Sequence, residues 1–471
     1  MVFSSLIFLF IFLPVVLIIY YLLNKSLKNI FLTISSLFFY AWGEQKLVML
    51  MIFSIIINYL GGILIERSVL KNRIKLSKAH LALFIGINLL LLGYFKYFNF
   101  FIDTLQGFNV ITSVKIEQIL LPIGISFFTF QGLSYLIDVY YQRTNAQKNL
   151  ISLGLYISMF PQLVAGPIVR YIDVSKQIKE NRDFDLVKFQ VGIKRFIVGL
   201  FKKVIIANQM AVVADAAFNN SQDIGSLALW LGIICYTFQI YYDFSGYSDM
   251  AIGLGKMFGF DFLENFDHPY VSKSIQEFWR RWHISLSSWF RDYLYIPLGG
   301  NRKGLSRTYV NLSIVFLLTG LWHGASWNFI VWGLFHGMFL IIERMGLNSK
   351  LNKLPSIVGH TYTLVVVVIG WVFFKAETLN KAVLYLKGMF SIKFSNNEYI
   401  FQYMDPYFIF VIMLAIIFST KLKFHLSRLI FSGRLNFFKK LLDNPIYIIL
   451  LVISLMELAQ SNYNPFIYFR F

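Results

Sequence analysis

Apolar runs recur along the whole chain, and most are about 20 residues long, the length that a helix needs to cross the hydrocarbon core of a bilayer. Clear examples are residues 2–23, 47–65, 81–101, 119–140, 226–242, 360–374, 406–419 and 447–458. This pattern predicts an all-α, polytopic membrane protein with about eleven transmembrane helices and one or two segments that only dip into the membrane. No polar stretch of domain size remains, so we expect residues 1–471 to form a single membrane domain.

The composition agrees with this interpretation. The chain is 57% hydrophobic and 14% charged, whereas soluble domains contain about 25% charged residues. The first apolar run is too long for a signal peptide and is not preceded by a basic stretch, so we expect it to be the first span. The single cysteine, Cys235, permits no intramolecular disulfide and is expected to serve in packing.

A net charge of +19 is compatible with nucleic-acid binding, but its distribution favours a membrane explanation. Basic residues gather in the loops 24–29, 66–80 and 141–149. The loops between them, 43–46 and 102–117, hold one lysine each. Such a bias places basic loops in the cytoplasm beside anionic membrane lipids. We therefore expect an external N-terminus and no nucleic-acid partner, and we predict no topology beyond residue 165, where the alternation ends.

Two polar regions interrupt the apolar pattern. Residues 166–203 are rich in lysine and arginine, and parts of them suit an amphipathic helix at the membrane interface. Either a lipid-headgroup anchor or a site for an anionic ligand explains this first region. Residues 261–303 mix charged and aromatic side chains too tightly for a simple span, which favours short re-entrant or interfacial helices around a cavity. An aromatic belt with snorkelling arginines is the alternative for this second region, but it explains His283 poorly.

The segment 317–337 is a membrane-length apolar run that carries two histidines, His323 and His336. Ionisable residues inside a membrane usually face a cavity and take part in chemistry or transport. A histidine can act as the general base that activates a hydroxyl for attack on an acyl carbonyl, a role worth about 10²–10⁴ in rate. Small residues around His323 leave room for a substrate, and Trp322 and Trp327 could wall a channel. A packed histidine bonded to a carbonyl is the alternative.

Other chemistries lack their motifs. The chain has no phosphate-binding G-x-x-x-x-G-K-[ST] loop, no H-E-x-x-H helix and no G-x-S-x-G elbow. Its histidines lack the spacing of metal ligands, so we expect no metal site.

At this point several long motifs match a known family. They are SLFFYAWG (36–43), LPIGISFFTFQGLSYLIDVY (121–140), FPQLVAGPIVR (160–170), YYDFSGYSDMAIGLGKMFGF (241–260), ENFDHPYVSKSIQEFWRRWHISLSSWFRDYLYIPLGGNRKG (264–304), TGLWHGASWNFIVWGLFHG (319–337), GWVFFKAE (370–377) and NPFIYFRF (464–471). The chain resembles the membrane-bound O-acyltransferases, in particular the bacterial branch that acetylates alginate and peptidoglycan. The teichoic acid D-alanyl transferase is a more distant relative.

The resemblance implies a ring of tilted helices around a central tunnel, with a catalytic core at about residues 121–377. It maps the family's near-invariant histidine onto His323 and a second tunnel histidine onto His283. The donor would be cytoplasmic acetyl-CoA, used as a substrate, with no permanently bound cofactor. The acceptor would be a glycan outside the bacterial cytoplasmic membrane, and an extracytoplasmic SGNH-type partner would complete the transfer.

The remaining candidate residues follow from the same comparison. Arg280 or Arg281 could hold the phosphates of the donor. The other candidates for the substrate tunnel are Trp322, Ser326, Trp282, Asn265, Asp243 and Ser245. For Asp243, Ser245 and His336, buried helix packing is an equally open interpretation.

The C-terminal aromatic tail, residues 464–471, is a further candidate. Its Tyr468 matches a tyrosine that the resemblance implies as an acyl carrier, and an aromatic anchor at the membrane interface is the alternative. For the whole protein, the rival from another class is a polysaccharide transporter or flippase. Transporters of this kind favour internal repeats, which the chain lacks. A catalytically silent scaffold is a third possibility.

Overall fold

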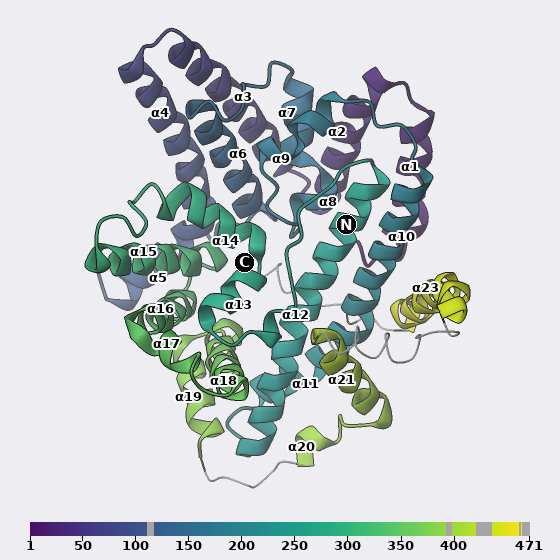
Figure 1. Cartoon of the computed structure of the whole chain (residues 1–471), viewed down its shortest axis with the longest axis vertical. Helices are drawn as coiled ribbons and strands as arrows, with labels where there is room; N and C mark the ends of the chain where they lie inside the picture. The colour runs from purple at the N-terminus through teal and green to yellow at the C-terminus, as the bar shows by residue number, and fades with distance from the viewer. Residues whose placement is uncertain (111–116, 392–397, 421–435, 461–462, 464–471) are drawn as a thin grey trace. The chain divides into compact units, whose positions relative to one another are not determined.

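A computed structural model describes all of the chain except residues 111–116, 392–397, 421–435, 461–462 and 464–471. Every regular element in the described part is helical, and no strand occurs there. The prediction of an all-α protein is confirmed (Figure 1). The expected ring around a central tunnel stays a prediction.

Six helical segments in the described residues are long and apolar enough to cross a membrane. They are Val48–Leu70, Ile74–Gly107, Leu186–Asn219, Ser226–Met257, Trp327–Leu351 and Ser356–Lys375. Three shorter apolar helices, Phe8–Leu22, Pro406–Ser419 and Asn444–Gln460, accompany them. The chain is therefore a multi-pass membrane protein, while the expected count of about eleven spans stays a prediction.

Contacts gather the helices into two compact units. Unit 1 comprises Met1–Phe196 and Ala251–Leu263, and unit 2 comprises Ile197–Met250 and Glu264–Phe471. Helices α10 (Leu186–Phe201) and α12 (Ser226–Met257) contribute to both. The other elements of unit 1 are η1 (Phe8–Phe12), α1 (Leu13–Leu22), α2 (Lys25–Ala41), α3 (Val48–Leu70), α4 (Ile74–Leu92), η2 (Gly93–Tyr97), α5 (Phe98–Gly107), α6 (Ile125–Tyr140), α7 (Leu150–Ser158), α8 (Phe160–Leu163) and α9 (Tyr171–Lys179).

The core of unit 1 lies where α3, α4 and α6 pack together. Asn58 of α3 and Asn88 of α4 donate amide hydrogen bonds to each other at 3.2 Å. Gly132 of α6 faces this pair, and a Cβ there would lie 2.6 Å from the Asn58 amide nitrogen. The polar region 166–203 contributes the amphipathic helix α9, whose apolar face is buried. Arg182, which follows α9, is also buried and donates to the Tyr20 hydroxyl at 2.8 Å.

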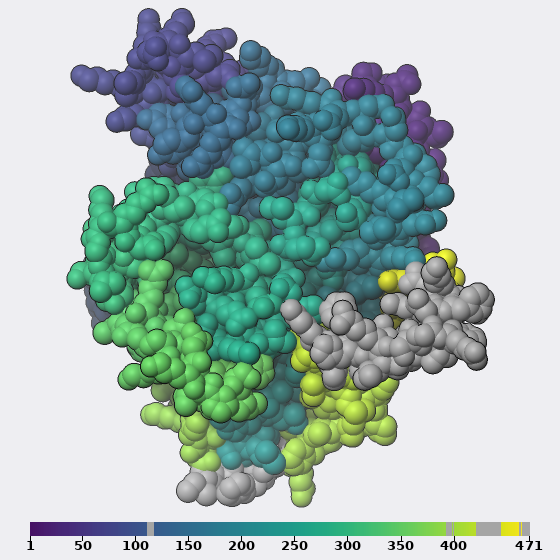
Figure 2. Space-filling model, in the orientation of Figure 1, coloured from purple at the N-terminus to yellow at the C-terminus, as the bar shows by residue number. Residues whose placement is uncertain are grey.

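Unit 2 contains the second polar region and both family histidines. Its elements are η3 (Lys202–Ala207), α11 (Asn208–Asn219), η4 (Pro269–Val271), α13 (Ile275–Arg281), α14 (Ile284–Phe290), η5 (Arg291–Tyr295), α15 (Leu305–His323), α16 (Trp327–Ile342), η6 (Glu343–Leu347), α17 (Asn348–Leu351), α18 (Ser356–Lys375), α19 (Leu379–Met389), α20 (Glu398–Phe401), α21 (Pro406–Ser419) and α23 (Asn436–Gln460). The green-coloured helices α13 to α19 are closely packed on the face shown in Figure 2. Residues 261–303 contain the short helices α13 and α14, and their expected re-entrant or interfacial position stays a prediction.

Candidate active site

Helices α15 and α16 form a hairpin that is held at backbone contact by two glycines. A Cβ at Gly320 would lie 2.2 Å from the Phe329 carbonyl oxygen, and one at Gly333 would lie 2.2 Å from the Phe316 carbonyl oxygen. Only hydrogen fits at these positions, so the two helices approach more closely than larger residues allow. The hairpin brings the end of α15, where His323 lies, against the side chains of α16.

His323 is surrounded by aromatic rings. Its side chain is buried, with its ring centroid 4.9 Å from that of Trp322 and 5.0 Å from that of Trp332. Phe374, near the end of α18, lies 5.2 Å away. Three helices therefore contribute to an apolar wall around the imidazole, which limits the access of water to any group bound beside it.

His283 lies at the sharp turn between α13 and α14. Its backbone adopts a left-handed conformation with φ of 44°, which is uncommon for a residue other than glycine. The turn is held by Asn265, whose carbonyl oxygen accepts the Ile284 N–H at 3.0 Å. The Asn265 side-chain oxygen lies 3.1 Å from His283 Nδ1. Such strained positions cluster at functional sites, because the surrounding structure must maintain them.

The hydrogen bonds of Asn265 assign the tautomer of His283. Its side-chain oxygen accepts the backbone N–H and the hydroxyl of Ser285, at 3.2 and 2.8 Å, while its amide nitrogen donates to Ser248 at 3.1 Å. The oxygen must therefore face His283, and Nδ1 carries the proton that it accepts. In the neutral ring Nε2 is then the unprotonated nitrogen. It is buried and has no hydrogen-bond partner in the described residues, so it can accept a proton.

Indole rings connect three buried histidines in the described part of unit 2. Trp322 contacts His283 at 5.8 Å between centroids and His323 at 4.9 Å. Trp332 contacts His323 at 5.0 Å and His336 at 5.2 Å. The histidines therefore alternate with tryptophans in one continuous cluster, which the sequence spacing alone did not indicate.

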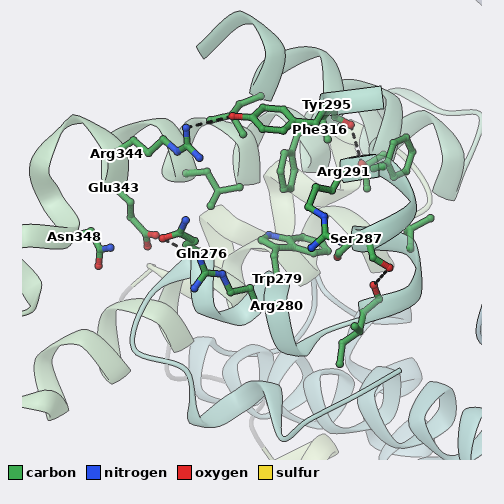
Figure 3. A pocket seen from close by; sticks show the side chains of 18 residues that line it. Gln276, Trp279, Arg280, Ser287, Arg291, Tyr295, Phe316, Glu343, Arg344 and Asn348 are labelled. Atoms are coloured by element: carbon green, nitrogen blue, oxygen red, sulfur yellow. Dashed lines mark hydrogen bonds between the residues drawn. The ribbon is translucent and has the colours of Figure 1, made fainter. Parts of the chain in front are cut away.

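A pocket of about 410 Å³ lies on one side of this cluster (Figure 3). Arg280, Arg291 and Arg344 contribute exposed guanidinium groups to its lining, and Trp279 and Phe316 contribute apolar surface. Figure 3 shows Trp279 in the middle of these side chains. The pocket therefore combines positive charge with an apolar wall, a combination suited to an amphipathic anion.

Glu343 also lines the pocket, but its carboxylate is already engaged in hydrogen bonds to the backbone of α13. Its carboxylate accepts the backbone N–H groups of Ile275 and Gln276 at 2.6 and 2.9 Å. These groups belong to the first turn of α13, where an acidic side chain is stabilising. The carboxylate thus fixes α13, and with it Trp279 and Arg280, against the end of α16.

Comparison with known proteins identifies the family. The sequence model of the membrane-bound O-acyltransferase family matches residues 141–376. This chain belongs to the membrane-bound O-acyltransferase family. The matched segment contains His283, His323 and His336 together with the aromatic cluster around them. The chain is therefore an acyltransferase.

Two curated relatives match this chain over its full length, and a third matches about half of it. A probable alginate O-acetylase of Pseudomonas putida is 42% identical, and the alignment covers 100% of both chains. The peptidoglycan O-acetyltransferase of Helicobacter pylori is 35% identical over 100% of this chain and 98% of the relative. A teichoic acid D-alanyltransferase of Bacillus subtilis is 30% identical over 54% of this chain and 67% of the relative.

The structure of this acyltransferase separates the two arginines that the sequence offered as phosphate ligands. Arg280 lines the pocket and has no ion-pair partner within the described part of the chain. Arg281 instead pairs with Asp267 at 2.7 Å and with Glu277 at 3.0 Å. Two carboxylates satisfy the Arg281 guanidinium, so Arg280 is the stronger candidate for a free anion.

The other predicted residues lie at varying distances from the cluster. Trp282 is buried and contacts Trp371 at 5.0 Å, and Ser326 forms the N-cap of α16. Asp243 forms a buried ion pair with Lys203 at 2.9 Å, and Ser245 is buried nearby on α12. Tyr468 lies outside the described residues.

Sequence reasoning missed Trp332, Arg344 and Phe374, and of these only Phe374 comes from a helix far from His323 along the chain. It also grouped Lys202 and Lys203 with an interfacial basic region. In the structure the π-helical segment η3 directs both lysines to carboxylates of α12, Lys202 to Asp249 at 2.6 Å and Lys203 to Asp243. A signal was available, because Asp243 and Asp249 stand in an apolar span and charges there require partners.

Proposed function

We propose that this acyltransferase takes acetyl groups from cytoplasmic acetyl-CoA and passes them across the bacterial cytoplasmic membrane to a polysaccharide. The acceptor would be peptidoglycan or an alginate-like exopolysaccharide, as the names of the full-length relatives suggest. The observation that carries the proposal is the buried pair of histidines, His323 and His283, joined by Trp322 beside an arginine-lined pocket.

His323 is the proposed general base. It removes the proton from an attacking hydroxyl while the oxygen forms a bond to the thioester carbonyl carbon. The tetrahedral intermediate collapses by breaking the carbon–sulfur bond, and the CoA thiolate leaves and takes up the proton. The aromatic wall supports this role, because it shelters the thioester from hydrolysis. His283, with Nε2 unprotonated, is the proposed second proton acceptor.

The pocket is the proposed entrance for the donor. Acetyl-CoA carries phosphates at one end and a thioester at the other, joined by the pantetheine arm. Arg280 and Arg344 can bind phosphate by charge-assisted hydrogen bonds. Trp279, in the pocket wall, contacts Trp332, and Trp332 in turn contacts His323. The thioester end would therefore approach His323 while the phosphates stay at the arginines.

Tyr468 is the proposed acyl carrier that faces the partner protein. Its support is the anchoring of Tyr463, five residues earlier, whose hydroxyl donates to Asp215 while Asp215 also pairs with Lys375. Lys375 directly follows Phe374, which contacts His323. The described chain thus ends beside the helix whose Phe374 contacts the proposed base, and this contact is the support for the proposed carrier. The phenol would lose its proton to His323 and receive the acetyl group as an ester. It would then yield the acetyl group to an SGNH-type partner, which would complete the transfer to a sugar hydroxyl of the glycan.

The test uses the full-length protein in liposomes with acetyl-CoA radiolabelled on the acetyl group. Wild type should release CoA and retain label on the protein, and His323→Ala should lower both by about 10²–10⁴. His80→Ala is the matched control, because His80 lies in unit 1 and contacts Ser68. Equal CoA release by wild type and His323→Ala, in the presence of the partner and a glycan, would refute the role of His323.

The carrier role is tested separately. Tyr468→Phe should abolish label on the protein and transfer to glycan, whereas Tyr463→Phe should keep the label and reduce the transfer rate only a few-fold. If Tyr468→Phe acetylates the glycan at the wild-type rate, the tail is an aromatic anchor and not a carrier.

A further inference from the structure

Four of the buried nitrogens in the ring cluster belong to side chains that connect the pocket with His323. They are the indole nitrogens of Trp279 and Trp332 and both ring nitrogens of His336, and none has a hydrogen-bond partner in the described part of the chain. Buried polar groups in native proteins are nearly always paired, because each unpaired group costs about 1–3 kcal/mol. A cluster of four is therefore complementary to a ligand that offers hydrogen-bond acceptors and donors.

The three side chains form one site. His336 is fully buried, and its ring lies edge-on to Trp279 at 5.2 Å and to Trp332 at 5.2 Å. Gly370 of α18 packs against its Nε2, and a Cβ there would lie only 2.7 Å from this nitrogen. An aromatic cluster formed for packing alone would have no need of an imidazole at its centre, since a phenylalanine ring fills similar space at no polar cost.

The position of the site along the cluster indicates what it contacts. Trp279 lines the pocket on one side, and Trp332 contacts His323 on the other. The order is thus arginines, then paired indoles with an imidazole, then the proposed catalytic histidine. An acyl-CoA presents the same order of groups, with phosphates first, then the two amides of the pantetheine arm, then the thioester.

We infer that Trp279, Trp332 and His336 form a binding subsite for the amide groups of the donor's pantetheine arm. The inference rests on the proposed function, in which the donor is an acyl-CoA. The indole N–H groups donate to amide carbonyl oxygens, while the neutral imidazole accepts an amide N–H at one nitrogen and donates from the other. A lipid tail or a plain alkyl chain would leave all four nitrogens unpaired, so amides are the matching chemistry.

Binding to the full-length protein in nanodiscs tests the subsite without requiring turnover. Calorimetric titration with pantetheine should show about tenfold weaker binding to His336→Phe, which keeps a ring and removes both nitrogens. Trp279→Phe should weaken binding by a similar factor, and His336→Gln should recover part of the loss. Phe278→Leu is the matched control, because Phe278 stacks on the same His336 ring at 6.5 Å and carries no polar atom.

Turnover separates binding from packing. His336→Phe should raise KM for acetyl-pantetheine about tenfold with little change in kcat, and should leave the acetyl thioester of a simple alkanethiol unaffected. Equal losses with both donors, or unchanged pantetheine binding, would overturn the subsite. Pantetheine binding that depends on His336, without any CoA release from wild type, would sustain the subsite and refute acetyl transfer. If wild type turns over and His336→Phe has the same KM and kcat, acetyl transfer would be sustained and the subsite refuted.

Discussion

His283 and His336 are both completely buried in unit 2, yet they are held in opposite ways. His283 is held by hydrogen bonds, because Asn265 contacts its Nδ1 and is itself fixed by Ser248 and Ser285. His336 has no hydrogen-bond partner in the described residues and is held by packing against aromatic rings, among them Trp279 and Trp332.

The difference teaches which property each environment controls. A polar scaffold fixes the tautomer and leaves one defined nitrogen to accept a proton. An aromatic setting fixes the position of the ring but leaves the use of its nitrogens to a ligand. The two regions should therefore respond differently to substitution. Loss of a scaffold residue impairs proton chemistry, whereas loss of a packing residue impairs folding or donor selection.

The largest effect is expected where the aromatic region depends on backbone contact. Gly333→Ala adds a methyl group whose carbon would lie 2.2 Å from the Phe316 carbonyl oxygen. This oxygen belongs to the backbone and cannot rotate away. Overpacking of this kind should lower the free energy of unfolding by about 3 kcal/mol or more. Thermal unfolding in detergent measures the change.

Gly86→Ala is the control for that substitution. Gly86 also lies in an apolar helix, α4, but a Cβ there meets nothing within 4 Å. Alanine should leave stability unchanged or raise it by about 0.5–1 kcal/mol, because glycine is the weaker helix former. Comparable melting temperatures for the two variants would mean that α15 and α16 are not in backbone contact.

The polar region should respond with an intermediate effect. Asn265→Ala leaves the His283 Nδ1–H and the Ser285 N–H without their acceptor, at a cost of about 1–3 kcal/mol for each unpaired group. Turnover should fall further than the stability loss explains, because the tautomer of His283 is no longer fixed. Parallel measurements of melting temperature and acetyl transfer check this.

Asn265→Asp and Ser248→Ala refine that test. Asn265→Asp retains the acceptor toward His283 and should keep more activity than Asn265→Ala. Ser248→Ala removes only the outer hydrogen bond and should cost about 1 kcal/mol with little loss of turnover. If all three variants retain wild-type activity, the scaffold has no role in the reaction.

The sequence was sufficient for the all-helical class, and its motifs for the family, because both depend on local patterns. Apolar runs of membrane length predict helices wherever they occur, and His323 is conspicuous in a span that otherwise excludes ionisable groups. The number of spans was harder to predict. Segments such as Ile74–Gly107 and Leu186–Asn219 join several helices through π-helical turns, which periodicity does not reveal.

The composition of the site depends on contacts between distant helices. Arg280 and Arg281 are neighbours with the same charge. Only the tertiary structure shows that Arg280 lines a pocket, whereas Arg281 forms ion pairs with Asp267 and Glu277. Phe374 reaches His323 from α18, 51 positions further along the chain. No local rule pairs residues at such separations, so the contribution of Phe374 to the aromatic wall was not predictable.

The smallest expected effect concerns donor selection by that wall. Phe374 lies 5.2 Å from His323, so Phe374→Ala should open space beside the imidazole for a longer acyl group. Two additional methylene groups, buried at about 0.8 kcal/mol each, correspond to about a tenfold gain for butyryl-CoA relative to acetyl-CoA. The ratio of the two kcat/KM values measures the shift. Phe373→Ala is the control, because Phe373 contacts Phe335 and not the histidine. An unchanged ratio in Phe374→Ala, or an equal shift in both variants, would show that the aromatic wall positions His323 without selecting the length of the acyl group.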